Sequence, residues 1–241
     1  MNDRQRYVAD IQPVAEVIVT GRAELAFWQA RLQSAQLLPT NLHGYAHVLI
    51  SATSARWHGV PFKEWSVSIG VGEAGADGLP PAYYLAHAVN SRALFAWSER
   101  TFFHTPYFPG DIEVQAMRPV GVQLRLNAAL SFEAVMADRA TAGPISDEHW
   151  RGPIYLPARS RRAPDAGEFF SAVLEGPTEV YPFEAARDRL SIKATPRAAV
   201  FDWLLQSAFT PLTWRVRRAA HHAKAATRRR EGGAAHGTIA P

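Results

Sequence analysis

The sequence has 241 residues, of which 47% are hydrophobic and 20% charged, and it contains no cysteine. This composition predicts one large globular domain, and it excludes disulfides, thiolate metal sites and cysteine nucleophiles. No apolar run approaches the roughly 18 residues of a membrane-spanning helix, and no apolar segment follows the charged N-terminus, so we expect a cytoplasmic protein.

The net charge of +4 arises in the C-terminal region. Residues 215–230 contain seven basic side chains and no acidic one, and without them the chain carries −3. We therefore expect a mildly acidic domain, residues 1–211, followed by a basic Ala/Arg-rich tail, residues 212–241, that is helical at most and partly disordered. Such a tail could contact an acidic surface. It has no aromatic residue beyond Trp214 to stack on bases, so no nucleic-acid partner is expected.

Runs rich in β-branched residues predict strands in the first half of the chain. In chain order these strands cover 14–20, 46–53, 65–71 and 83–89. Apolar residues at helical spacing predict a helix over 21–35. A second helix is expected over 92–103, because Asn90 or Ser91 can cap its first turn and Pro106 follows its end.

The second half of the chain is predicted to contain further strands and short helices. A hairpin is expected from 112–117 and 122–132, and weaker strands near 153–156, 179–183 and 190–193. One short helix is expected over about 166–174, and Thr195-Pro196 begins another that Pro211 ends. Many strands with few helices predict an α+β domain on an antiparallel or mixed sheet.

Two familiar spacings lack the structural context that their chemistry needs. Gly70-Val-Gly-Glu-Ala-Gly75 follows a strand, as a dinucleotide-binding loop does, but the next residues cannot begin the helix that binds the pyrophosphate. His43 and His47 have helical ligand spacing, but Gly44 and the strand that follows prevent a common face. We therefore predict no cofactor and no metal.

The segment Tyr83–Gly110 contains the densest group of reactive side chains. A strand, a capped helix and a proline-rich turn are expected to bring His104 and Tyr107 close to Glu99 and Arg100. Imidazole and phenol groups beside these charges can transfer protons or stabilise an oxyanion. The alternative is that the aromatic residues here belong to the core and that His104 is only a polar neighbour.

The same segment resembles the acetoacetate decarboxylase-like superfamily, especially an uncharacterised branch that lacks the catalytic lysine. Asn90, Glu99 and Pro106 follow the family's order, and Phe103–Phe108 reads like that branch's Phe-His-x-Pro-Tyr-Phe. Glu64, within Val-Pro-Phe-Lys-Glu-Trp-Ser-Val, matches a family active-site glutamate. The resemblance extends over about 14–205. It implies a closed, mostly antiparallel β-barrel flanked by a few helices, with an internal pocket, and assembly as a homo-oligomer.

The resemblance ends at the nucleophile. The family decarboxylates through a Schiff base on a lysine activated by a second lysine, but this chain has no lysine at the corresponding turn, 105–108. Its three lysines are Lys63, Lys193 and Lys224. Lys63 points away from the pocket if Glu64 points in, Lys224 lies in the predicted tail, and Lys193 is a weak substitute. Imine chemistry is therefore not expected.

These observations predict a small-molecule enzyme that acts on a carbonyl- or enol-containing substrate by acid–base chemistry without a Schiff base. It would be a lyase, dehydratase or isomerase. The candidate catalytic residues are Glu64, His104 and Tyr107. The candidate substrate-binding residues are His47, His87, Asn90 and Arg100. The hypothesis requires Glu64 and His104 to share one interior cavity; the alternative is a non-catalytic barrel that binds a small ligand.

Overall fold

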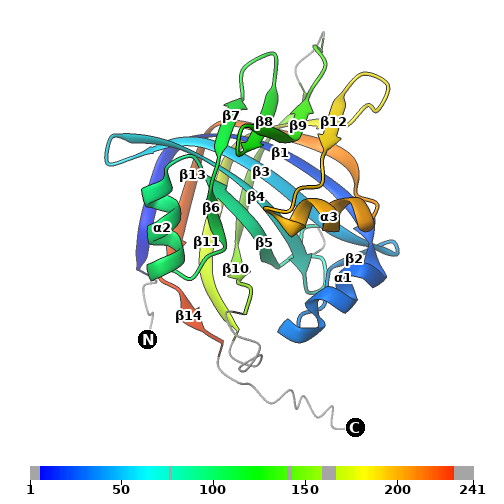
Figure 1. The fold of residues 1–241 in the computed structure, drawn as a ribbon. Coiled ribbons are helices and arrows are strands. Elements are labelled where there is room, and N and C mark those ends of the chain that lie inside the picture. Colours follow the sequence, from blue (N-terminus) through cyan, green and yellow to red (C-terminus); the bar gives the residue numbers. More distant parts are fainter. Residues whose placement is uncertain (1–5, 76–77, 140–142, 159–166, 231–241) are drawn as a thin grey trace.

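A computed structural model of the chain describes residues 6–75, 78–139, 143–158 and 167–230 (Figure 1). Strands dominate these residues, and short helices connect some of them. In chain order the elements are β1 (Tyr7–Glu24), α1 (Leu25–Leu32), the 3-10 helix η1 (Gln33–Ala35), β2 (Asn41–Leu42), β3 (Tyr45–Trp57), β4 (Val60–Val71), β5 (Ala82–Asn90), α2 (Ala93–Phe102), β6 (Tyr107–Pro109), β7 (Asp111–Gln115), β8 (Gly121–Leu126), β9 (Ala129–Val135), β10 (Ile145–Tyr155), β11 (Glu168–Pro182), β12 (Arg189–Ile192), α3 (Ala199–Gln206), β13 (Thr210–Ala225) and β14 (Arg228–Arg229).

Most of the strands belong to one large, curved sheet (Figure 1). Its hydrogen-bonded order is β1-β13-β11-β10-β5-β4-β3-β2, with β14 beside β11 and β6 beside β5. β1 pairs with β3 as well as with β13. Most neighbours are antiparallel, but β5 runs parallel to both β10 and β6. The predicted strand-rich architecture with few helices is therefore confirmed, and the sheet is mixed rather than purely antiparallel.

A smaller sheet of four strands, ordered β12-β9-β8-β7, packs against one face of the large sheet. β7 and β8 form the hairpin that the sequence predicts. The single strand expected over 122–132 is instead divided between β8 and β9. Asn127 and Ala128 adopt φ angles of 50° and 64°, which turn the chain between these two strands.

Side-chain alternation gives the large sheet two different faces. On β4, residues 65, 67 and 69 are fully buried in the hydrophobic core, whereas residues 64, 66 and 68 line a cavity. The core face is covered by α1, α3 and the small sheet. Trp65 stacks on Phe201 of α3, with ring centroids 5.3 Å apart. The opposite face carries the polar residues that concern function.

The strands predicted in the first half of the chain lie within β1, β3, β4 and β5, and the three weaker ones lie in or overlap β10, β11 and β12. The helix expected over 92–103 is α2, and the helix expected after Thr195-Pro196 is α3, which begins at Ala199. Among the described residues, no helix has both the length and the apolar character needed to cross a membrane.

Strand pairing overrides the helical spacing at two places. Residues 21–24, expected to begin a helix, instead continue β1, because Arg22 pairs with both His47 of β3 and Thr210 of β13. The short helix expected near 166–174 is also wrong, since Glu168–Pro182 form β11 between β10 and β13. Residue 166 lies outside the described residues.

The prediction of a basic tail from residue 212 is wrong for residues 212–225. These residues belong to β13, which lies between β1 and β11 in the large sheet. Trp214 and Val216 point into the core, whereas Arg215 and Arg217, which alternate with them along the strand, face the cavity. The basic side chains are tolerated there because acidic residues from distant strands pair with them. The rest of the predicted tail includes residues 231–241, which lie outside the described residues.

Candidate functional site

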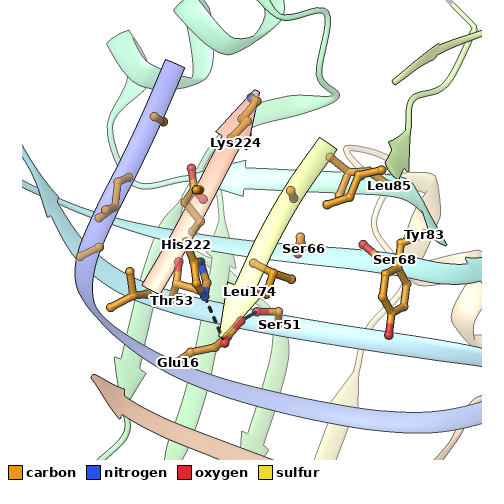
Figure 2. A pocket seen from close by; sticks show the side chains of 18 of the residues that line it. Glu16, Ser51, Thr53, Ser66, Ser68, Tyr83, Leu85, Leu174, His222 and Lys224 are labelled. Carbon is orange, nitrogen blue, oxygen red and sulfur yellow. Dashed lines mark hydrogen bonds and ion pairs between the residues drawn. The ribbon is translucent and has the colours of Figure 1, made fainter. Parts of the chain in front are cut away.

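The cavity-facing side of the large sheet encloses a space of about 360 Å³. Its walls come from β1, β3, β4, β5, β10, β11 and β13, and α2 contributes to one end. Figure 2 shows side chains from several of these strands converging on this space, including Ser66 and Ser68 from β4 and Lys224 from β13. A cavity that brings polar groups from many strands together is the usual setting for binding or catalysis.

A row of five polar residues crosses this cavity wall, one from each of five strands. The row runs Asn90, Glu64, Thr53, Glu16 and Arg217, because each residue pairs directly with the next across neighbouring strands. Paired residues on neighbouring strands point to the same face, and neighbouring strands lie about 4.8 Å apart. Glu64 and Glu16 are therefore separated by two strand spacings, about 10 Å at the backbone.

Glu64 lies in a pocket of neutral hydrogen-bond donors. Asn90 Nδ2 donates to Glu64 Oε1 at 2.9 Å, and the Asn90 Oδ1 atom accepts from the Arg92 backbone N–H at 2.8 Å, which fixes the amide. The Tyr107 hydroxyl also hydrogen-bonds Glu64. Burial and the nearby charge of Glu99 raise the pKa of Glu64 to about 7, against the opposing effects of Tyr107, Lys224 and Asn90. Glu64 can therefore gain or lose a proton near neutral pH.

Lys224 of β13 lies at the same end of the cavity. Its ammonium pairs with the Glu99 carboxylate, which also accepts a 2.7 Å hydrogen bond from Thr105 Oγ1. The ammonium nitrogen lies 4.6 Å from the ring centroid of Phe103 and 4.7 Å from that of Phe170. These contacts hold a cation inside the cavity. The sequence analysis excluded Lys224 only because it placed this residue in a solvated tail.

Glu16 has a charged environment instead. Arg217 donates to Glu16 Oε2 at 2.9 Å, Ser51 Oγ donates to Oε1 at 2.7 Å, and His222 Nε2 lies 3.3 Å from Oε2. Burial alone would raise the pKa of Glu16, but its electrostatic and hydrogen-bond contacts with His222 and Arg217 lower that pKa far below its usual value. Arg217 is itself held by Glu148 at 2.8 Å. Glu16 is therefore a carboxylate.

Four of the predicted site residues line the cavity, namely Glu64, Tyr107, Asn90 and His47. His47 projects from β3 and is only 8% exposed. Burial, assisted by the charge of Arg215, lowers the pKa of His47 to about 4, so its imidazole is neutral at pH 7. Glu64, Tyr107 and Asn90 are in direct contact, and His47 lies six residues along β3 from the Glu64 partner, Thr53.

His104 lies apart from this group. It ends the segment after α2 with a φ angle of 59°, and its Nδ1 atom is 2.8 Å from both carboxylate oxygens of Glu168. It is not among the described residues that line the cavity. The expectation that Glu64 and His104 share one cavity is therefore wrong, because the left-handed backbone at His104 aims its side chain elsewhere.

His87 and Arg100 also lie outside the cavity lining. The pairing of β4 with β5 shifts register between Val67 and Ser68, so His87 does not follow the inward alternation of Leu85. It stacks instead on Phe108, with ring centroids 5.2 Å apart. Arg100 Nη1 donates to the Tyr107 carbonyl oxygen at 3.1 Å, so it supports the turn rather than facing the cavity.

The sequence analysis did not single out Glu16, Arg217 and His222. Their one sequence signal is alternation, since apolar Trp214 and Val216 are interleaved with basic residues as in a strand. Within the described residues, no group of three or more acidic or histidine side chains is arranged to hold a metal ion.

Comparison with solved structures identifies the fold. The chain has a TM-score of 0.61 and 14% identity to an acetoacetate decarboxylase-like enzyme from Sphingomonas wittichii RW1, over 92% of each chain. Acetoacetate decarboxylase from Legionella pneumophila gives 0.62 and 9% identity, over 95% of this chain and 90% of that one. The enduracididine biosynthesis enzyme MppR, solved with pyruvate, gives 0.62 and 11% identity over 95% and 92%.

The chain therefore has the acetoacetate decarboxylase-like fold, as the resemblance in its sequence implies. At such low identity the likeness defines the fold alone. No protein-family model matches the sequence, and no curated protein matches it at a significant level.

Proposed function

We propose that this protein is a small-molecule enzyme that acts on a carbonyl- or enol-containing substrate by general acid–base catalysis. The observation that carries the proposal is Glu64, a carboxyl with a pKa of about 7 that contacts Tyr107 and Asn90 inside the cavity. A group that titrates near the working pH is an efficient proton carrier. The fold supports a small carbonyl compound as substrate, since MppR was solved with pyruvate and with a pyruvate condensation product.

Each cavity residue has a distinct proposed role. Glu64 transfers the proton, and Asn90 fixes the orientation of its carboxyl group. The Tyr107 hydroxyl and the Lys224 ammonium stabilise negative charge that develops on the substrate oxygen during enolisation. The double pairing of β1 with β3 and β13 supports a sheet that closes as a barrel and excludes bulk water from this chemistry.

Lys224 supports a second candidate chemistry, an imine with the substrate carbonyl. It is an amine inside the cavity, whereas Lys63 and Lys193 are not among the described residues that line it. An imine requires a free amine, however, and the Lys224 nitrogen is paired with Glu99 and lies over two aromatic rings. We therefore favour acid–base chemistry without a Schiff base.

Hydrogen exchange tests the proposal. We expect the purified protein to exchange the α-hydrogens of at least one member of a panel of 2-oxo and 3-oxo acids, pyruvate included, with D₂O, followed by proton NMR. Glu64→Gln should lower the exchange rate by about 10²–10⁴-fold. The matched control Glu113→Gln, at an exposed position on β7, should leave the rate unchanged. Equal rates for Glu64→Gln and the wild type would contradict the proposal.

Borohydride reduction separates the two chemistries. Treatment of the protein with the same panel and sodium borohydride, followed by mass spectrometry, should leave Lys224 unmodified. A reduced adduct on Lys224 would establish the imine route instead. A saturable thermal shift with no exchange of any panel member would favour the non-catalytic ligand-binding alternative.

A further inference from the structure

We propose that His222 is a second proton-transfer residue of this cavity and that Glu16 positions it. The inference deepens the proposed function and rests on it. His222 lies two residues before Lys224 on β13, and both side chains face the cavity. Figure 2 shows the His222 ring beside Glu16, joined to it by a dashed contact.

The contact with Glu16 determines which ring nitrogen of His222 is basic. Glu16 is only 2% exposed, and its carboxylate is held by Arg217 and Ser51, so it can only accept a hydrogen bond from the imidazole. His222 Nε2, 3.3 Å away, therefore carries the proton in the neutral ring. Nδ1 then keeps its lone pair, and among the described residues it has no hydrogen-bond partner. The arrangement of carboxylate and imidazole is the one that prepares a histidine to act as a base.

Through its contact with Glu16, His222 lies beside the end of the row of paired residues that Glu16 and Arg217 occupy. Thr53 lies between Glu64 and Glu16, so the two carboxyl groups begin about 10 Å apart at the backbone. In this proposal a short carbonyl compound binds over Thr53, with Glu64 on one side and His222 on the other. Its carbonyl oxygen would face Glu64, and the carbon next to the carbonyl would face His222 Nδ1.

Two proton transfers then form an enol. His222 Nδ1 takes a proton from the carbon next to the carbonyl, and the electron pair of the C–H bond becomes the carbon–carbon double bond. The electron pair of the carbonyl π bond moves to oxygen, which takes a proton from the Glu64 carboxyl group. The products are an enol, an imidazolium and a carboxylate, so charge and protons balance. The reverse transfers restore the ketone, with a proton returned to carbon by His222.

This arrangement defines the substrate class more narrowly. The substrate must be a small carbonyl compound with at least one hydrogen on the adjacent carbon, and the reaction class is enolisation or isomerisation by two separate proton carriers. Decarboxylation needs no base at the adjacent carbon, so the presence of His222 favours enolisation over it.

Exchange of the pyruvate methyl hydrogens with D₂O, followed by proton NMR, tests the role of His222. We expect His222→Gln to lower the rate by about 10²–10⁴-fold, as for Glu64→Gln. The control is His43→Gln, at an exposed turn, which should leave the rate unchanged. A rate within threefold of the wild type for His222→Gln, with a large loss for Glu64→Gln, would overturn the role of His222 and leave the proposed function standing. No loss for Glu64→Gln would overturn both.

The role of Glu16 has an independent spectroscopic test. Nitrogen NMR of histidine-labelled protein should find the neutral His222 ring protonated at Nε2, and Ser51→Ala, which frees one oxygen of Glu16, should preserve that tautomer. Protonation at Nδ1 in the wild type would overturn the proposal, since Nδ1 would then have no lone pair with which to accept the substrate proton. This measurement requires no turnover.

Discussion

Glu64 and Glu16 occupy the same row of the same sheet, two strands apart, yet they have opposite charge states. Glu64 contacts an amide and a phenol, and burial raises its pKa to about 7. Glu16 contacts a guanidinium, an imidazole and a hydroxyl, and its pKa is lowered. Both are enclosed by protein, so burial alone does not determine the charge of a carboxyl group.

The two glutamates show that the groups in contact with a buried carboxyl determine its protonation state and therefore its role. A carboxyl with neutral partners can exchange a proton near neutral pH, whereas a carboxylate held by a guanidinium can only organise the groups around it. Substituting these partners should therefore reduce or increase the difference in pKa between the two glutamates.

The most drastic change removes Arg217 and His222, the partners of Glu16 on β13, together with Lys224. Truncation after Trp214 deletes the remainder of β13 and leaves β1 and β11 without the strand between them. We expect this truncated chain not to fold, as measured by circular dichroism and limited proteolysis. Truncation after Arg230 removes no described contact and should fold like the full chain. A folded, protease-resistant chain ending at Trp214 would contradict the structural role of β13.

Arg217→Met removes only the guanidinium, so that Glu16 keeps Ser51 and His222 as partners and Glu148 keeps Arg215. We expect the free energy of unfolding to fall by about 3 kcal/mol, because the buried Glu16 carboxylate loses its guanidinium partner. Urea unfolding measures this loss. Arg229→Met, at an exposed position of β14, should change stability by no more than about 0.5 kcal/mol. Equal stabilities of the two variants would mean that Glu16 does not depend on Arg217.

Glu64→Gln should make stability less dependent on pH. The pKa of Glu64 is higher in the folded protein, about 7, than the ordinary glutamate value of 4.5 expected when unfolded, so the folded state binds more protons between these values. The wild type therefore loses stability as pH rises from 4.5 to 7, by roughly 3 kcal/mol relative to the glutamine variant. Urea unfolding at pH 5 and pH 8 measures the difference in free energy of unfolding between the wild type and the glutamine variant. A difference that stays constant between these pH values would show that the pKa of Glu64 is not raised by folding.

Tyr107→Phe should produce the smallest effect, an increase in the pKa difference between Glu64 and Glu16. The Tyr107 hydrogen bond lowers the pKa of Glu64, so its loss should raise that pKa further, by about one pH unit. Carbon NMR of the Glu64 carboxyl group follows this shift. Tyr45→Phe, at an exposed ring on β3, is the control and should produce none. A fall in the pKa of Glu64 would contradict the assigned hydrogen bond.

Local sequence patterns predicted the elements whose partners are near in the chain. The family resemblance, and not periodicity, singled out Glu64, whereas the β-branched runs became β3, β4 and β5. These strands could be predicted because strand periodicity and neighbouring segments carry the required information.

The remaining site residues depend on pairing between the two ends of the chain. Glu16 and Arg217 are separated by 201 residues, so a cluster of basic residues near the C-terminus gave no sign of its acidic partners. His87 was misplaced because a register shift changes the face of β5, and His104 because its backbone adopts a positive φ. Neither departure has a pattern that sequence periodicity detects.

The pairing of Tyr7 with Ala225 places the first and last long strands of the molecule side by side. A short linker between these two positions could join them, and new chain ends could be cut at the exposed turn of His58 and Gly59. The resulting circular permutant would keep every wall of the cavity while making β13 and β1 consecutive in the chain. The contact of Glu16 with Arg217 would then lie within one hairpin, at a much shorter sequence separation, and the chain should fold faster.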